Sequence, residues 1–254
     1  MSSLADDYCD QLKQQFKIEF AAFPPNQPVV LGDFGTLDDH VFVRLGNVTS
    51  VFGVTFTGQE FPNQPANFTF TSESSTDVEI HAKGDATPSG VALKAGVDIG
   101  FSSKHSVFFN AAGCIPAQIQ DQIKLGNDIM ALFKAGKWQK NFVVITNLYK
   151  GGSTTAVVSA SNNSSISLDA QADVPSIDLS DASLKLTVKH SKALALTVVT
   201  EGSLTPLFGL SCIQGVFNPD FGPVSLRSLI GPSSEQPRLE ATKDGDFLLF
   251  RQLS

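Results

Sequence analysis

Alternation of apolar and polar side chains is clearest in SISLDAQADV, which spans residues 165–174. Apolar residues fall on every second position there, which is the period of a β-strand and not of a helix. A returning limb repeats this period over residues 184–198, so residues 153–200 predict one long amphipathic β-hairpin. Its apolar face is expected to contain Ile166, Leu168, Ala170, Leu184, Leu186 and Val188.

A weaker hairpin of the same kind is predicted over residues 76–102, with a turn at the Gly- and Pro-containing residues 84–90. Two environments suit such hairpins. In a soluble domain the apolar face covers a core, whereas in a membrane barrel it faces lipid. The alternation alone leaves both environments open. The apolar face of this hairpin is expected to contain Val78, Ile80, Val91, Leu93, Val97 and Ile99.

Other segments indicate a mixed fold. Leu4, Tyr8, Leu12 and Phe16 recur every four residues, which predicts a helix over residues 3–20. Apolar residues at helical spacing between Pro116 and Gly136 predict a second helical segment, and the apolar run at 141–149 predicts a strand buried on both faces. We therefore expect an α+β fold: a twisted, mostly antiparallel sheet, two long amphipathic hairpins, an N-terminal helix and a central helical segment.

Length and composition predict a large core. The chain has 254 residues, of which 42% are hydrophobic, and its 20 Phe carry no polar atom that needs a partner. We expect one domain over residues 1–230. The Pro- and Ser-containing residues 231–254 are expected to form a short tail that is docked or regulatory.

The net charge of −7 argues against nucleic acid as a partner. Membrane affinity would then rest on apolar burial or on local lysines. The chain has no signal peptide and no apolar run long enough for a transmembrane helix, so it is expected to be made as a cytoplasmic protein. The lysines available for acidic lipid head groups, which otherwise form solvated surface, are Lys13, Lys17, Lys134, Lys137 and Lys140.

No pattern of catalytic or metal-binding residues stands out. Cys9, Cys114 and Cys212 are far apart and odd in number, which predicts free thiols in a reducing compartment. The four histidines are isolated in the sequence, and no serine lies in a Gly-x-Ser-x-Gly motif. We therefore expect neither enzymatic activity nor a cofactor. A protein-interaction module without membrane activity stays open as an alternative function.

The order of these segments resembles the pore-forming domain of gasdermins. Residues 141–149, NFVVITNLY, are similar to the aromatic-Val-Val-Thr segment that enters the second transmembrane hairpin of that family. The Ser-, Gly- and Ala-rich limbs that follow are similar as well, and the resemblance in architecture covers most of Leu4 to Gln214. It implies a protein that is soluble in the cytoplasm, assembles as an oligomer in acidic phospholipid membranes, and permeabilises the cell membrane during programmed cell death.

The short C-terminal segment resembles two subgroups of the family. Fungal single-domain members imply activation by an encounter with a divergent homologue, in non-self recognition. Short bacterial members act in innate immunity and imply proteolytic removal of a C-terminal peptide and acylation of an N-terminal cysteine, for which Cys9 is the candidate. The absence of an evident cleavage linker favours the fungal type.

The resemblance also predicts a conformational change. In the soluble form the hairpins are expected to be short or folded back, with their apolar faces on the core, and on assembly these faces would turn to lipid. A charge near the bilayer centre costs about 2–4 kcal/mol. Leu168→Lys or Leu186→Lys is therefore expected to abolish permeabilisation.

Overall fold

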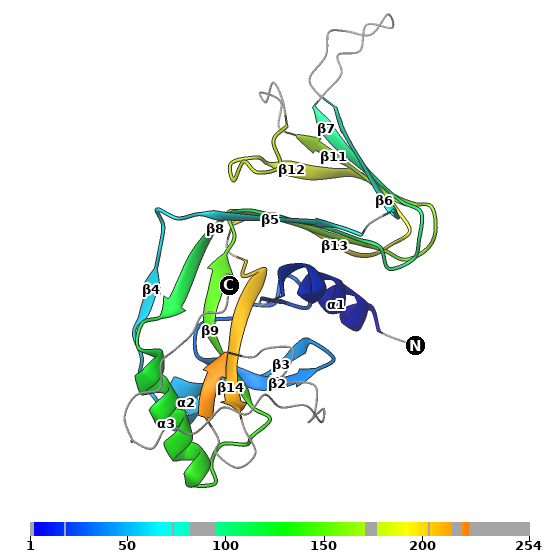
Figure 1. Cartoon of the computed structure of the whole chain (residues 1–254). Coiled ribbons are helices and arrows are strands. Elements are labelled where there is room, and N and C mark those ends of the chain that lie inside the picture. The colour runs from blue at the N-terminus through cyan, green and yellow to red at the C-terminus, as the bar shows by residue number, and fades with distance from the viewer. Residues whose placement is uncertain are drawn as a thin grey trace, which may run out of the picture.

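The computed structural model describes residues 3–17, 19–72, 74–81, 95–170, 177–202, 204–214 and 220–223 (Figure 1). Within them the protein is a mixed α+β structure whose strand pairs are antiparallel. One sheet has 11 strands and the other has 4. The predicted tail at residues 231–254 lies outside the described residues.

Helix α1 (Leu4–Phe16) confirms the predicted N-terminal helix. Ser3 is its N-cap: the Ser3 hydroxyl accepts a hydrogen bond from the Asp6 amide at 3.1 Å, and the Asp6 carboxylate accepts one from the Ser3 amide at 2.7 Å. This capping box satisfies two amides that the first helical turn leaves unpaired. The buried face of α1 includes Tyr8 and Leu12, which pack against the large sheet.

The large sheet is built around β9 (Val143–Lys150), which confirms the predicted buried strand. The order of the main path is β1-β14-β9-β8-β10-β13, and the remaining strands pair at its sides. The other strands of this sheet are β1 (Phe20–Ala21), β2 (Asp33–Asp38), β3 (Val41–Asn47), β4 (Gly58–Glu60), β5 (Ala66–Thr71), β8 (Val107–Ile119), β10 (Ser153–Ser159), β13 (Leu194–Glu201), β14 (Leu207–Gln214) and β15 (Asp220–Pro223). A short helix, α2 (Val48–Phe52), follows β3.

The predicted helix between residues 116 and 136 is partly wrong. Residues 116–119 belong to β8, and α3 begins only at Gln122 and ends at Lys134, with Asp121 as its N-cap. Ala117 and Ile119 are buried while Gln118 is exposed, so this segment has the period of a strand. Pairing of Gln118 with Asn147 of β9 imposes that conformation over the helical spacing of the isoleucines.

The predicted hairpin over residues 153–200 is divided between the two sheets, whereas the two strands of the hairpin over residues 76–102 pair with each other in the small sheet. The small sheet contains β6 (Thr76–His81), β7 (Gly96–Phe101), β11 (Ser164–Ala170) and β12 (Leu186–Lys192), in the order β12-β11-β7-β6. The predicted hairpin over residues 153–200 therefore contributes β10 and β13 to one sheet and β11 and β12 to the other. Figure 1 shows the small sheet lying above β5 and β13, with α1 below them.

Candidate functional site

The two sheets contain the halves of one four-stranded ribbon. In the large sheet the neighbouring strands run β5-β8-β10-β13, which we call the proximal half. In the small sheet they run β6-β7-β11-β12, which we call the distal half. Each proximal strand continues along the chain into, or out of, the distal strand at the same position in this order. We call the connection between the halves, at residues 72, 74–75, 102–106, 159–163 and 193, the bend.

Strand register continues through the bend along the central pair of the ribbon. Phe101 pairs with Ser164 in the distal half, and Val107 pairs with Val158 in the proximal half. The step from 101 to 107 equals the step from 164 to 158, so neither strand gains or loses a residue. The two pairs therefore belong to one ladder that is interrupted only by folding.

The apolar face of the distal half packs against the proximal half. Val97, Ile99 and Leu168 are at most 1% exposed, and they cluster with Phe108 and Val157 of the proximal half. The opposite face of the proximal half packs against α1. The ribbon is thus folded back on the core in this conformation, with both faces of its proximal half covered.

The residues predicted to face lipid occupy three kinds of position. Ile80 and Val188, on the two outer strands, are 47% and 46% exposed. Val91 and Leu93 lie outside the described residues. The others are buried or partly buried in the cluster between the halves: Val78, Val97, Ile99, Ile166, Leu168, Ala170, Leu184 and Leu186.

The other face of the distal half carries charge. His81 Nε2 lies 2.9 Å from Asp98 Oδ2, and Lys189 Nζ lies 3.5 Å from Asp169 Oδ1. Hydrogen bonding to Ser167, with a smaller effect of His81, lowers the pKa of Asp98. The distal strands are therefore amphipathic, with an apolar face inside and a charged face outside.

Backbone strain is concentrated at the bend. Four non-glycine residues there, one on each strand, have positive φ: Ser74 at 57°, His105 at 61°, Asn163 at 61° and Ala193 at 53°. The left-handed conformation costs an L-residue on the order of 1–2 kcal/mol, although asparagine tolerates it better than most. Ala193 has no polar side-chain atom that could compensate this cost.

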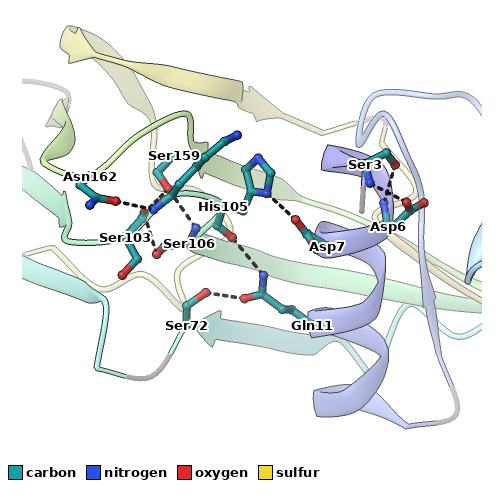
Figure 2. Close-up of polar contacts among 11 residues, drawn as sticks. Ser3, Asp6, Asp7, Gln11, Ser72, Ser103, His105, Ser106, Ser159 and Asn162 are labelled. Atoms are coloured by element: carbon teal, nitrogen blue, oxygen red, sulfur yellow. Dashed lines mark hydrogen bonds and ion pairs between the residues drawn. The ribbon is translucent and has the colours of Figure 1, made fainter. Parts of the chain in front are cut away.

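Serine side chains satisfy the interrupted ladder at the bend (Figure 2). The Ser159 hydroxyl donates to the Ser103 carbonyl at 2.6 Å and accepts from the Ser106 amide at 2.9 Å. The Lys104 amide donates to the side-chain oxygen of Asn162 at 3.2 Å. These contacts replace backbone pairs that a straight ladder would make.

Helix α1 contacts the bend directly (Figure 2). The Gln11 amide group donates to the His105 carbonyl at 3.0 Å and accepts from the Ser72 hydroxyl at 2.5 Å. The Asp7 carboxylate pairs with His105 Nδ1. A further pair between Asp10 and the His40 ring holds α1 to the turn between β2 and β3. Sequence reading missed these contacts, because nothing local links His105 to a carboxylate 98 residues away.

Two ionisable residues, Lys13 of α1 and Glu19, are buried where α1 packs against the sheet. Lys13 is 1% exposed, its Nζ lies 3.6 Å from the Phe20 ring centroid, and it has no hydrogen-bond acceptor among the described residues. Glu19 is 6% exposed and accepts from the Asn147 side chain at 3.4 Å. Burial lowers the pKa of Lys13 to about 8 and raises the pKa of Glu19 to about 7. In this conformation Lys13 is therefore not part of the exposed surface.

The remaining predicted lipid-binding lysines do not form one patch. Lys17 is exposed at the end of α1, whereas Lys134, Lys137 and Lys140 are exposed at and beyond the end of α3. Figure 1 shows α1 and α3 in separate parts of the molecule.

The predicted acylation site is inaccessible in this conformation. Cys9 is 1% exposed, its Sγ lies 3.7 Å from the Ala21 carbonyl oxygen, and burial raises the pKa of its thiol to about 12. Acylation of Cys9 would require α1 to leave the sheet.

Across the described ranges no three or more His, Cys, Asp or Glu side chains gather as a metal site would require. None of the helices in those ranges is both long enough and apolar enough to cross a membrane. Comparison of the chain with protein-family models, curated proteins and solved structures found no match.

Proposed function

We propose that this chain is a gasdermin-like pore-forming protein that permeabilises membranes by straightening its folded ribbon. The observation that carries the proposal is the continuous register of the central pair, Phe101 with Ser164 and Val107 with Val158. Because the ladder keeps its register across the bend, straightening needs no re-pairing of the central strands. For the central strands the change is then a rotation about the bend.

The straightened ribbon is long enough to cross a bilayer. Residues 96–112 already pair in two sections on either side of the bend. As one strand they would span about 56 Å, at about 3.3 Å per residue. The hydrocarbon core is only about 30 Å thick, and a tilted strand crosses it with about 9–11 residues.

Straightening would also bring the apolar faces of the two halves onto one side of the ribbon, with Ser103 and His105 between them on that side. Val97 and Ile99 differ from Val107 by an even number of positions in the sequence, and Leu168 differs from Val158 by an even number as well. Residues separated by an even number lie on the same face of a strand. The lipid-facing surface would thus extend from the distal half into the proximal half, with Asp98 and Asp169 on the water-filled side.

Several copies are needed for such a pore. An isolated ribbon in lipid would leave the outer edges of β6 and β12 without backbone partners, which is costly in hydrocarbon. We propose that copies of this chain, or this chain and a divergent homologue, close the edges in a ring on an acidic phospholipid membrane. The soluble cytoplasmic form would then assemble in the cell membrane and kill the cell by permeabilising it.

Dye release from vesicles containing acidic phospholipid tests the proposal. Val188→Lys is the sharpest variant, because Val188 is already 46% exposed and pairs directly with Leu168 on the proposed lipid face. We expect it to fold and to lose dye release, since the charge would cost about 2–4 kcal/mol in each copy near the bilayer centre. Leu168→Lys is less informative, because Leu168 is 1% exposed and its substitution would also disrupt the folded-back form.

The matched control is Thr187→Lys, which places the same charge one residue away on the opposite face, across from Asp169. It is expected to release dye at the rate of the unmodified protein. Wild-type release by Val188→Lys would show that this face does not meet lipid and would contradict the proposed pore.

A soluble interaction module is the second candidate. In the described residues β3 pairs only with β2, and its Val43 and Leu45 are 46% and 54% exposed. An exposed apolar edge strand is a common site of protein association. This alternative predicts no dye release from any vesicle, and loss of partner binding in a Leu45→Lys variant.

A further inference from the structure

We propose that helix α1 is a latch that holds the strained bend closed, and that its release lets the ribbon straighten. This inference rests on the proposed function for its biological purpose, but the latch itself is a property of the soluble protein. The evidence is the geometry of the bend and of its contacts with α1.

The bend favours straightening once nothing holds it. Positive φ is found at Ser74, His105, Asn163 and Ala193, whereas residues of a straight antiparallel strand have φ of about −140°. Straightening would move one residue on every strand from a disfavoured conformation to the one that strands prefer.

Two residues of α1 oppose this change. Asp7 and Gln11 are four positions apart and therefore lie on one face of the helix. They contact His105 on one strand connection of the bend and Ser72 on another, so α1 links two of the four strand connections. His105 is also one of the strained residues, and Gln11 holds its carbonyl in the bent position.

The Ser72 hydroxyl extends the latch into the ladder. It donates to Gln11 and also accepts from the Val107 amide at 2.7 Å, where the proximal half of the ribbon begins. The helix therefore contacts the strands where a straightening motion must start. In addition, α1 covers the part of the apolar face that carries Phe109 and Val158, which continues into the distal apolar face in a straight ribbon.

Amide hydrogen exchange of β7 and β11 in the protein without membrane tests the latch. Gln11→Ala removes both Gln11 hydrogen bonds and is expected to speed this exchange by about tenfold or more. Asp7→Asn, which keeps the size of the side chain but removes its charge, is expected to change exchange in the same direction and by less.

Ala193→Gly tests the strain separately, because glycine adopts positive φ without steric cost. It is expected to slow exchange of β7 and β11 by about fivefold. Asp39→Gly is the matched control: Asp39 is exposed with φ of 42° in the turn between β2 and β3, so relief there leaves exchange in the distal half unchanged.

Dye release measured on the same variants separates the latch from the pore. Faster release by Gln11→Ala and slower release by Ala193→Gly would support both. The expected exchange changes with no release by any form would support the latch and overturn the proposed function. Unchanged exchange in Gln11→Ala and Asp7→Asn would overturn the latch, and faster exchange in Ala193→Gly would overturn the role of strain.

Discussion

Replacing Lys13 with methionine is expected to stabilise the protein at neutral pH. The Lys13 side chain is 1% exposed, and its ammonium group has no hydrogen-bond acceptor among the described residues. Burial lowers its pKa from 10.5 to about 8, although attraction to Glu19 partly opposes this. A shift of that size means that keeping the charge in the folded protein costs about 3 kcal/mol.

Favourable contact with the Phe20 ring offsets part of this cost. A cation 3.6 Å from a ring centroid in a dry site gains about 2 kcal/mol. Methionine has nearly the same length, fills the same space and retains contact with the ring through its sulfur atom. We therefore expect Lys13→Met to raise the free energy of unfolding by about 1 kcal/mol.

Urea denaturation at pH 7 measures this change, and hydrogen exchange of the α1 amides shows whether the gain is local to the helix. Lys17→Met is the matched control: Lys17 is an exposed lysine at the end of the same helix, and surface substitutions usually change stability by less than about 0.5 kcal/mol. A Lys13→Met protein that is less stable than the unmodified one would refute the reasoning, because the buried ammonium would then be a net stabilising group.

Three further predictions follow from buried groups. Burial raises the pKa of Glu19 from 4.5 to about 7. The folded state therefore binds more protons than the unfolded state in this interval, and the free energy of unfolding falls as pH rises from 4.5 to about 7. For Lys13 the unfolded state binds more protons, so the free energy of unfolding rises from pH 8 to 10.5. Urea midpoints measured across pH should show a minimum near pH 7–8. Glu19→Gln should remove the fall in the midpoint on the acidic side of this minimum. Arg44→Ala should lower the free energy of unfolding by about 2 kcal/mol, because it leaves the 1% exposed Asp33 carboxylate without the guanidinium 2.8 Å away; no measurable loss on urea denaturation would contradict this. Burial raises the pKa of the Cys9 thiol to about 12, so maleimide should label it about a hundredfold more slowly than a free thiol, and labelling at the rate of an exposed thiol would show that α1 is not docked.

Local sequence patterns predicted the elements whose conformation depends on neighbours in the chain. The four-residue spacing from Leu4 defined α1, and the apolar run before Tyr149 defined β9. Residues 116–119 were misassigned because isoleucines four apart fit a helix as well as a strand. Pairing with β9, which is distant in sequence, decided between the two.

Most of the candidate site depends on contacts between distant segments. The amphipathic strands were visible as alternation, but Ala193 carries no turn signal. Gln11 and Ser72, which form a hydrogen bond, are 61 positions apart in the sequence. The burial of Lys13 left a weak signal: together with Cys9 and Leu12 it completes an i, i+3, i+4 row on the face that packs inward. Its charge outweighed that spacing in the sequence-based prediction.

The unbroken register across the bend couples the lengths of two segments that are more than fifty residues apart. Residues 102–106 and 159–163 contribute five positions each between flanking pairs that belong to one ladder. Loss of a single residue from one segment would shift β7 against β11 by one position and exchange the apolar and charged faces of one strand. A deletion in either segment is therefore tolerated only with a matching deletion in the other. Variation in loop length, usually the least constrained property of a protein surface, is here restricted to changes made in pairs.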